Sequence, residues 1–162
     1  MKVIFLDVDG VLNSEKSRNE MYDNNKSWMW NEVANYHLEK LKKIVKETGA
    51  IIVLSSSWRL YHPKLTGFPE ITDELLKVLV DKMEDLELKI EDVTPDFRNK
   101  ARGLEIEDWV KKHPNIERYI ILDDDTDFLP YQKPFFIKTT FKDGLTDELA
   151  EKAIRILNKG KE

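Results

Sequence analysis

The chain begins with the stretch Val3-Ile4-Phe5-Leu6-Asp7-Val8-Asp9-Gly10, an apolar run followed at once by two aspartates and a glycine. A short apolar run cut off by a glycine is typical of a buried strand. Asp7 and Asp9 are two residues apart, so both leave the strand on the same side. Paired carboxylates at this position cost stability unless a cation or a reaction uses them. The alternative is that Asp-Val-Asp-Gly is only a turn, because Asp and Gly favour turns.

Two further apolar runs end in oxygen-bearing side chains. Residues 50–54 are followed by three serines at 55–57, and residues 119–122 by three aspartates at 123–125. Strands that each end in this way indicate one edge of a parallel sheet, where open α/β folds place their sites. Mg²⁺ prefers oxygen ligands of this kind. The sequence therefore predicts a site for a hard divalent cation at that edge.

The order of apolar and amphipathic segments predicts an α/β fold. Strands are expected at 3–6, 50–54, 88–93, 119–122 and 135–138, and helices at about 31–47, 72–85, 101–113 and 146–158. This alternation is typical of a βαβ series with right-handed crossovers, that is, a three-layer Rossmann-like core around a central parallel sheet. Thr72 and Thr146 are predicted N-caps, and Gly49 a C-cap. The histidines, which lack ligand spacing, are expected at the surface or its boundary: His37, His62 and His113.

Length and composition favour one soluble globular domain over residues 1–162, with 41% hydrophobic and 35% charged residues. No apolar run approaches the roughly 20 residues that cross a bilayer. No signal peptide is expected, because the first residues already form a core strand. The absence of cysteine excludes disulfides and fits a cytoplasmic protein. The net charge of −5 argues against general adhesion to nucleic acid.

Taken in order, these motifs resemble those of haloacid dehalogenase (HAD)-type phosphotransferases. That family has an Asp-x-Asp-Gly-Thr/Val strand end, a strand ending in Ser or Thr, a Lys or Arg opening a helix, and a strand followed by paired acids. The matching residues here are Asp7-Val8-Asp9-Gly10-Val11, Ser55, Arg102 or Lys100, and Asp123-Asp124.

A narrower resemblance is to the HAD domain of Swiss-army-knife RNA repair proteins. It is carried by Trp58-Arg59, Asp92-Val93-Thr94-Pro95, Arg102-Gly103-x-Glu105-Ile106-x-x-Trp109 and Asp143-Gly144-Leu145-Thr146. The Arg-Gly-x-Glu-Ile pattern favours Arg102 as the basic residue. The wider family more often has Lys there, which leaves Lys100 open.

The resemblance implies roles for these residues. Asp7 would be the nucleophile that forms an aspartyl-phosphate, and Asp9 the general acid and base. Ser55 would bind a phosphoryl oxygen, and Arg102 or Lys100 would offset its charge. The expected Mg²⁺ ligands are Asp7, Asp9 through its backbone carbonyl, and Asp123 or Asp124. Asp127 would be an acid that contacts a metal ligand and not the metal itself. Candidates for substrate binding are Gly10, Ser56 (or a cap of the next segment) and Arg59 (or a surface ion pair).

Residues 13–30 are polar and irregular, and they predict a flap-like insertion in place of a large cap domain. An open site admits a polymer, and the resemblance implies that the substrate is a phosphorylated RNA or DNA end or a nucleotide. Trp28 and Trp30 would stack on a base or pack the flap onto the core. A basic rim would support nucleic acid: Lys16, Arg18, Lys26, Arg59 and Lys64.

Two alternatives stay open. One is a phosphatase of the same mechanism acting on a small metabolite, which the acidic net charge favours. The other is a non-catalytic receiver or binding module with a phosphorylatable Asp. Receiver domains generally lack a second Asp two residues after the first, so Asp9 discriminates against this alternative.

Overall fold

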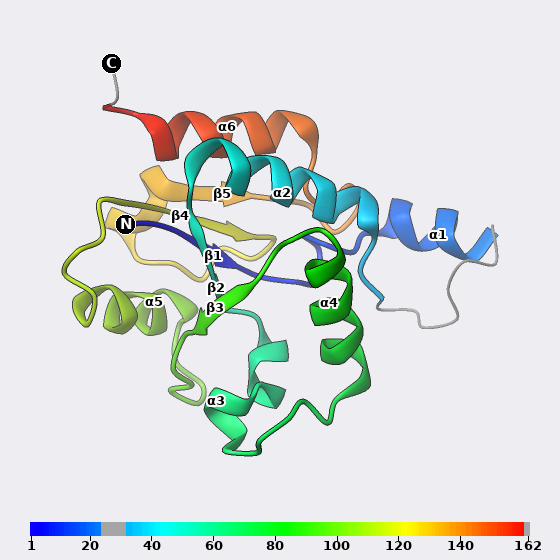
Figure 1. Ribbon diagram of the computed structural model, residues 1–162. Coiled ribbons are helices and arrows are strands. Elements are labelled where there is room, and N and C mark those ends of the chain that lie inside the picture. Colours follow the sequence, from blue (N-terminus) through cyan, green and yellow to red (C-terminus); the bar gives the residue numbers. More distant parts are fainter. Residues whose placement is uncertain (24–31, 161–162) are drawn as a thin grey trace.

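The computed structural model describes residues 1–23 and 32–160. Its centre is a five-stranded parallel sheet in the order β3-β2-β1-β4-β5 (Figure 1). The strands are β1 (Lys2–Leu6), β2 (Ile51–Leu54), β3 (Ile90–Val93), β4 (Arg118–Asp123) and β5 (Phe136–Lys138). This confirms the predicted α/β fold with a central parallel sheet.

Helices cover both faces of the sheet. One face packs against α2 (Asn35–Thr48), α4 (Glu74–Asp85) and α6 (Asp147–Asn158), and the other against α5 (Arg102–Lys111) (Figure 1). All five residues of β1 are buried, which is why residues 3–6 form an uninterrupted apolar run. Within the described ranges, no helix is long and apolar enough to cross a membrane.

The helix ends largely follow local sequence signals. Gly49 ends α2 in the left-handed conformation with φ 70°, and the Thr146 hydroxyl accepts a hydrogen bond from Leu149 N at the start of α6. The prediction of Thr72 as a cap is wrong, because Asp73 directly precedes α4 and its carboxylate accepts from Leu76 N at 2.9 Å.

The segment after β1 is more regular than its sequence predicts. Residues 15–23 form helix α1 (Glu15–Asp23), so the expectation of an irregular stretch is wrong there. Ser14 and Ser17 start the helix reciprocally: Ser17 N donates to Ser14 Oγ at 3.1 Å, and Ser14 N donates to Ser17 Oγ at 2.9 Å. Lys26, Trp28 and Trp30 lie outside the described residues. Within residues 1–23 and 32–160 no cap domain interrupts the core; the remaining helices are η1 (Ser57–Tyr61), α3 (Pro63–Thr66) and η2 (Pro130–Phe135).

His37 is fully buried, so its expected position at the surface or its boundary is wrong. Its Nδ1 lies 2.8 Å from the Leu145 carbonyl oxygen, and its Nε2 lies 3.0 Å from Ser14 Oγ. Because a carbonyl only accepts, Nδ1 carries the hydrogen and the Ser14 hydroxyl donates to Nε2. Burial lowers the pKa of His37, which favours this neutral form. The imidazole thereby joins α2 to the residue before α1 and to the segment before α6.

Gly144 packs directly against this imidazole. A Cβ at Gly144 would lie 2.6 Å from His37 Cε1, and the backbone has φ +65°. Gly67 has a similar φ of +75° but open space around the position of a Cβ. Both Gly→Ala variants incur a left-handed backbone cost of about 1–2 kcal/mol. We expect Gly144→Ala to lose a further 1–3 kcal/mol, roughly the cost of overpacking, in urea unfolding. Equal losses in the two variants would contradict the contact.

Candidate active site

Strand register brings the polar strand ends into one row. Leu6 of β1 pairs with Leu54 of β2 and Leu122 of β4, and Leu54 pairs with Val93 of β3. The backbone ladder continues one residue further across these strands. The next residues are Thr94, Ser55, Asp7 and Asp123, in that order across the sheet. Because successive side chains alternate between faces, this row turns towards the face that α5 covers.

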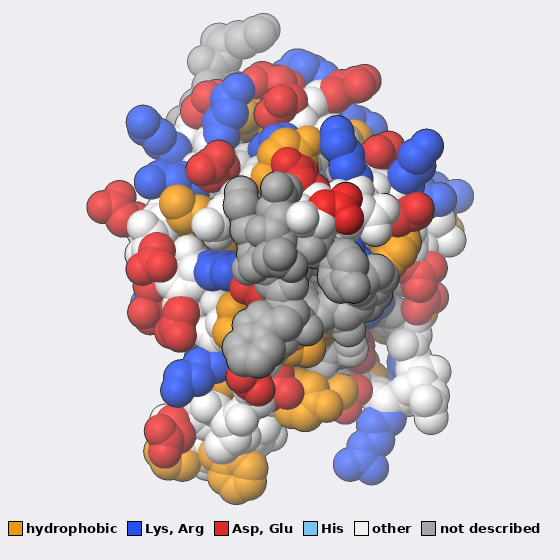
Figure 2. Space-filling view, turned by 90° about the vertical axis from the view of Figure 1, so that its right-hand side faces the viewer, with side chains coloured by type: hydrophobic (Ala, Val, Ile, Leu, Met, Phe, Trp, Pro, Cys, Tyr) orange, Lys and Arg blue, Asp and Glu red, His pale blue; other side chains and the backbone are white. Residues whose placement is uncertain are grey.

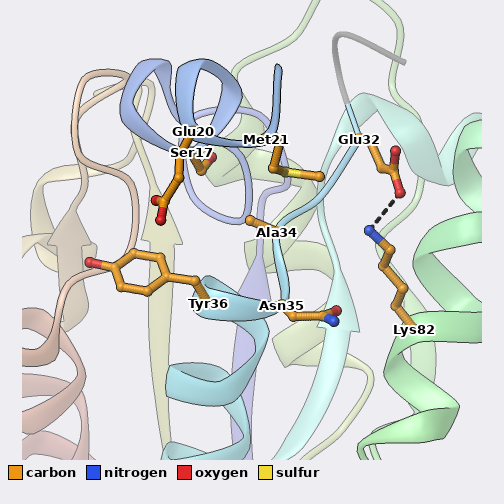
Figure 3. A pocket seen from close by; sticks show the side chains of 8 residues that line it. All are labelled: Ser17, Glu20, Met21, Glu32, Ala34, Asn35, Tyr36 and Lys82. Atoms are coloured by element: carbon orange, nitrogen blue, oxygen red, sulfur yellow. Dashed lines mark ion pairs between the residues drawn. The ribbon is translucent and has the colours of Figure 1, made fainter. Parts of the chain in front are cut away.

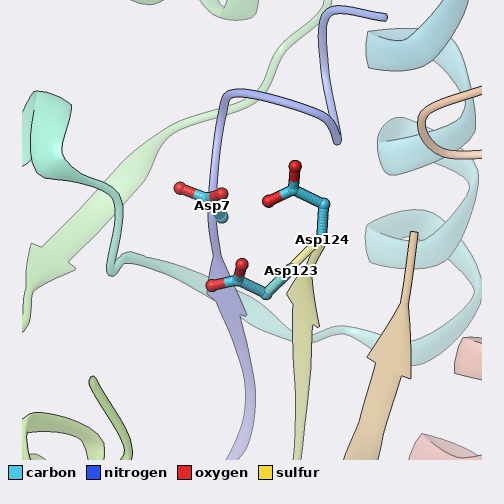
Figure 4. A group of neighbouring side chains, drawn as sticks. All are labelled: Asp7, Asp123 and Asp124. Carbon is cyan, nitrogen blue, oxygen red and sulfur yellow. The ribbon is translucent and has the colours of Figure 1, made fainter. Parts of the chain in front are cut away.

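Asp7, Asp123 and Asp124 form an acidic cluster at this edge. One carboxylate oxygen from each lies within 4.8 Å of the others. Figure 4 shows Asp123 and Asp124 at the end of β4, turned towards Asp7 at the end of β1. Asp123 is fully buried and Asp7 nearly so.

The electrostatics of the cluster are unfavourable for three bare carboxylates. Burial, followed by the charge of Asp123, raises the pKa of Asp7 to about 7. Burial and the same neighbour also raise the pKa of Asp124. Arg102 partly offsets this charge, with Nη1 2.6 Å from Asp123 Oδ2 and 3.2 Å from Asp7 Oδ1. One guanidinium does not balance the charge of three carboxylates, so the cluster could bind a further cation.

The structure brings Arg102, and not Lys100, to the cluster. Arg102 is the first residue of α5, and its backbone N–H donates to Asp127 Oδ2 at 3.0 Å. Asp127 therefore anchors the helix start that carries Arg102. Lys100 precedes the helix, is exposed, and has its Nζ 5.9 Å from the centre of the Phe97 ring.

The oxygen donors of the cluster fit Mg²⁺. Hard cations take carboxylate oxygens, and Asp7, Asp123 and Asp124 supply them from one small region. The Asp9 carboxylate lies apart from this set, because Oδ1 accepts from Asn13 Nδ2 at 2.9 Å and Oδ2 accepts from Trp58 Nε1 at 3.0 Å. Ligation through the Asp9 backbone carbonyl stays a prediction.

Gly10 shapes the cluster through its missing side chain. Its φ is 75°, and a Cβ would lie 2.2 Å from Asp124 Oδ2. The Gly10 carbonyl oxygen also accepts a hydrogen bond from Thr139 Oγ1 at 2.6 Å. The glycine thus lets the turn after β1 approach Asp124; its contact with substrate stays a prediction.

Ser55 presents a buried hydroxyl that has no hydrogen-bond partner among the described residues. A buried polar group without a partner costs free energy and is often explained by a missing ligand. This supports Ser55 as a contact for a phosphoryl oxygen. Ser56 instead accepts from Trp58 N at 3.2 Å and caps η1, which agrees with its alternative as a cap.

Arg59 is placed differently from either expectation, since it is 4% exposed and fully engaged within the protein. Its guanidinium lies 2.7 Å from Glu105 Oε2, and Glu105 Oε1 accepts from Phe97 N at 3.0 Å. The other N–H groups of Arg59 donate to the carbonyl oxygens of Ser55, Ser56, Thr94 and Pro95. Arg59 therefore has no donor left for a substrate phosphate, and its assignment to substrate binding is corrected. It ties the ends of β2 and β3 to α5.

The sequence also matches a known protein family over most of its length. The sequence model described as "HAD domain in Swiss Army Knife RNA repair proteins" matches residues 3–150. The chain belongs to this family. Comparison with curated proteins and with solved structures gives no match. Membership of the HAD family supports a HAD-type phosphatase and an association with RNA repair.

A separate cavity of 420 Å³ lies between α1, the start of α2 and α4 (Figure 3). Glu32 and Lys82 form an ion pair of 2.6 Å at its rim. None of the described residues that line it belongs to the acidic cluster: Ser17, Glu20, Met21, Glu32, Ala34, Asn35, Tyr36 and Lys82. The HAD motifs therefore lie outside this cavity, at the carboxyl edge of the sheet.

Asp124 offers a test of the cation site. Mg²⁺ at about 100 times its Kd should raise the free energy of unfolding of the wild type by about 2.7 kcal/mol. In Asp124→Asn we expect a higher stability without metal, because one repelling carboxylate is gone, and a smaller gain with Mg²⁺. Urea unfolding with and without MgCl₂ measures both. Asp125→Asn, at an exposed neighbour outside the cluster, should behave as the wild type. An undiminished Mg²⁺ gain in Asp124→Asn would count against this ligand set.

Proposed function

We propose that the protein is a Mg²⁺-dependent phosphatase that works through an aspartyl-phosphate on Asp7 and acts on a phosphorylated nucleic acid end or nucleotide. The acidic cluster carries this proposal, with Arg102 and the unpartnered Ser55 hydroxyl beside it in a chain of the HAD family.

The chemistry uses the two aspartates that open the motif. A carboxylate oxygen of Asp7 attacks phosphorus, and the bond from phosphorus to the leaving oxygen breaks. The leaving oxygen keeps the electron pair of that bond and takes a proton from Asp9. The Asp9 carboxylate then accepts a proton from water, whose oxygen attacks the phosphoryl group. The bond from phosphorus to the Asp7 oxygen breaks, and its electron pair returns to Asp7. Inorganic phosphate leaves, and both aspartates return to their starting states.

Neighbouring groups stabilise charge during these steps. The Ser55 hydroxyl donates to a phosphoryl oxygen, and Arg102 offsets the negative charge between phosphate and carboxylates. Mg²⁺ bound by Asp7, Asp123 and Asp124 would neutralise the charge that otherwise repels an anionic phosphate. Such catalysis rests on positioning and electrostatics, which rigid strand ends supply.

The nucleic acid substrate is supported by the family description and by the absence of a cap over the described core. An uncapped site admits the end of a polymer. The contacts of Asp9 favour a phosphatase over a non-catalytic receiver domain. Both of its carboxylate oxygens are held in a fixed position, as a general acid and base requires.

A small phosphorylated metabolite is the second candidate, because the expected basic rim is incomplete. Arg59 is buried, and Lys64 is paired with Asp92 at 2.9 Å. Among the described residues that are visible in Figure 2, acidic and basic side chains are interspersed. A surface of this kind gives little general attraction for a polyanion.

Phosphate release from a panel of substrates tests the proposal. The panel holds a 3′-phosphorylated oligonucleotide, a 5′-phosphorylated one, nucleoside monophosphates and an aryl phosphate, each with MgCl₂ and with EDTA. We expect Mg²⁺-dependent release that is fastest from an oligonucleotide end or a nucleotide. Release from the aryl phosphate alone would favour the second candidate. No release from a folded, Mg²⁺-bound protein would contradict the phosphatase.

A further inference from the structure

We propose that Trp58 is a positioning residue that holds the Asp9 carboxyl group towards the leaving oxygen through its indole N–H. The inference rests on the proposed function and adds to it a residue that sets the geometry of the general acid. Trp58 lies in η1, just after β2, whereas Asp9 follows β1, so the contact joins two separate strand ends.

Both oxygens of Asp9 are held by donors from different segments. Trp58 Nε1 lies 3.0 Å from Oδ2, and Asn13 Nδ2 lies 2.9 Å from Oδ1. Asn13 is itself fixed, because it is fully buried and its Oδ1 accepts from Gly10 N at 3.0 Å. One hydrogen bond to each oxygen fixes the orientation of the carboxyl group. Rigid supporting contacts of this kind hold catalytic groups in a productive geometry.

The chemistry of the two donors directs the proton of Asp9. An indole N–H and an amide NH₂ can only donate, so neither can accept that proton. The proton of the acid form is therefore left for the leaving oxygen.

The burial of Trp58 makes this contact stiff. The side chain is 8% exposed and belongs to the larger hydrophobic core, so the indole ring has little freedom to turn. Its backbone is held as well, since Trp58 N donates to Ser56 Oγ at the start of η1. A purely structural tryptophan would show the same burial, so the test must separate proton donation from packing.

Leaving groups of different basicity provide that separation. A ribose 3′-phosphate needs a proton on its departing alcohol, whereas 4-nitrophenolate departs without one. Trp58→Phe keeps an aromatic ring in the core and removes only the N–H. We expect kcat/KM, which reports the steps up to phosphorylation of Asp7, to fall by about 10-fold or more on the 3′-phosphorylated oligonucleotide. On 4-nitrophenyl phosphate the same variant should change kcat/KM by less than about 2-fold.

Trp109 supplies a matched control, because its indole Nε1 donates to another carboxylate, Asp92 Oδ2, at 2.9 Å. Trp109→Phe removes the same kind of bond away from Asp9 and should affect both substrates alike. Should Trp58→Phe not fold, Asn13→Ala removes the other donor to Asp9 and should give the same split.

An equal loss on both substrates in Trp58→Phe, or no loss on either, would overturn the positioning role. A wild-type protein without activity on either substrate would instead remove the proposed function itself, and this inference with it.

Discussion

Asp7→Asn should lower the rate of phosphate release by at least about 1,000-fold, on the scale seen when a catalytic nucleophile is removed. An amide cannot attack phosphorus as a carboxylate does, and the variant also replaces one of the three cluster carboxylates that would bind Mg²⁺ with a neutral group. Continuous release of inorganic phosphate with MgCl₂ present measures the loss.

Asp7→Asn should raise the free energy of unfolding although it lowers the activity. Burial and the Asp123 charge raise the pKa of Asp7 to about 7, so the folded protein binds this proton more tightly than the unfolded chain. For a group of this sign, stability falls as pH rises from about 4 to 7, and the full penalty is present above pH 7. In EDTA, Asp7→Asn should therefore gain stability over the wild type at pH 8 and little at pH 4.

The matched control for this experiment is Asp125→Asn. Asp125 is exposed and belongs to the same acidic run, but its carboxylate lies outside the cluster. This variant should keep the activity and stability of the wild type. Substantial phosphate release by Asp7→Asn, with Asp125→Asn unchanged, would show that another residue is the nucleophile.

Arg59→Ala should lower the free energy of unfolding by about 3–5 kcal/mol, the range for removing one partner of a buried ion pair. The Glu105 side chain is only 7% exposed, so its charge would be left buried without a partner. Carbonyl oxygens at the ends of β2 and β3 would lose their donors as well. Urea unfolding monitored by tryptophan fluorescence measures the change.

An exposed ion pair provides the comparison. Lys64 lies 2.9 Å from Asp92 with a half-exposed side chain, so Lys64→Ala should cost no more than about 1 kcal/mol. The double variant Arg59→Met with Glu105→Leu should recover much of the loss of Arg59→Ala, because neither charge is then buried alone. A loss in Arg59→Ala as small as that in Lys64→Ala would refute the importance of this buried pair.

The same buried pair explains part of the RNA-repair pattern. Arg59, Glu105 and Thr94 belong to three separate patterns in the sequence, yet their contacts join them at one place. Gly144 and Leu145 of a fourth pattern meet His37, and Leu145 N donates to the carbonyl oxygen of Val11, directly after Gly10. These positions therefore hold the strand ends in place. For Arg59, the sequence alone had suggested direct contact with the substrate.

The sequence by itself determined the sheet and the residues along its edge. Apolar runs such as residues 3–6 are continuous because a central parallel strand is buried on both faces. The carboxyl ends of parallel strands meet at one edge, so Asp7, Ser55 and Asp123 had to lie near one another. Both inferences need only local patterns and the geometry of a strand.

Only the tertiary structure decided which groups touch. The placement of α5 selects Arg102 over Lys100, although the two are separated by a single residue. Trp58 meets Asp9 across 49 positions of sequence. Glu105 forms its ion pair with Arg59 across 46 positions of sequence. Such contacts depend on strand register and on the angle at which each helix packs, and local periodicity carries no information about either.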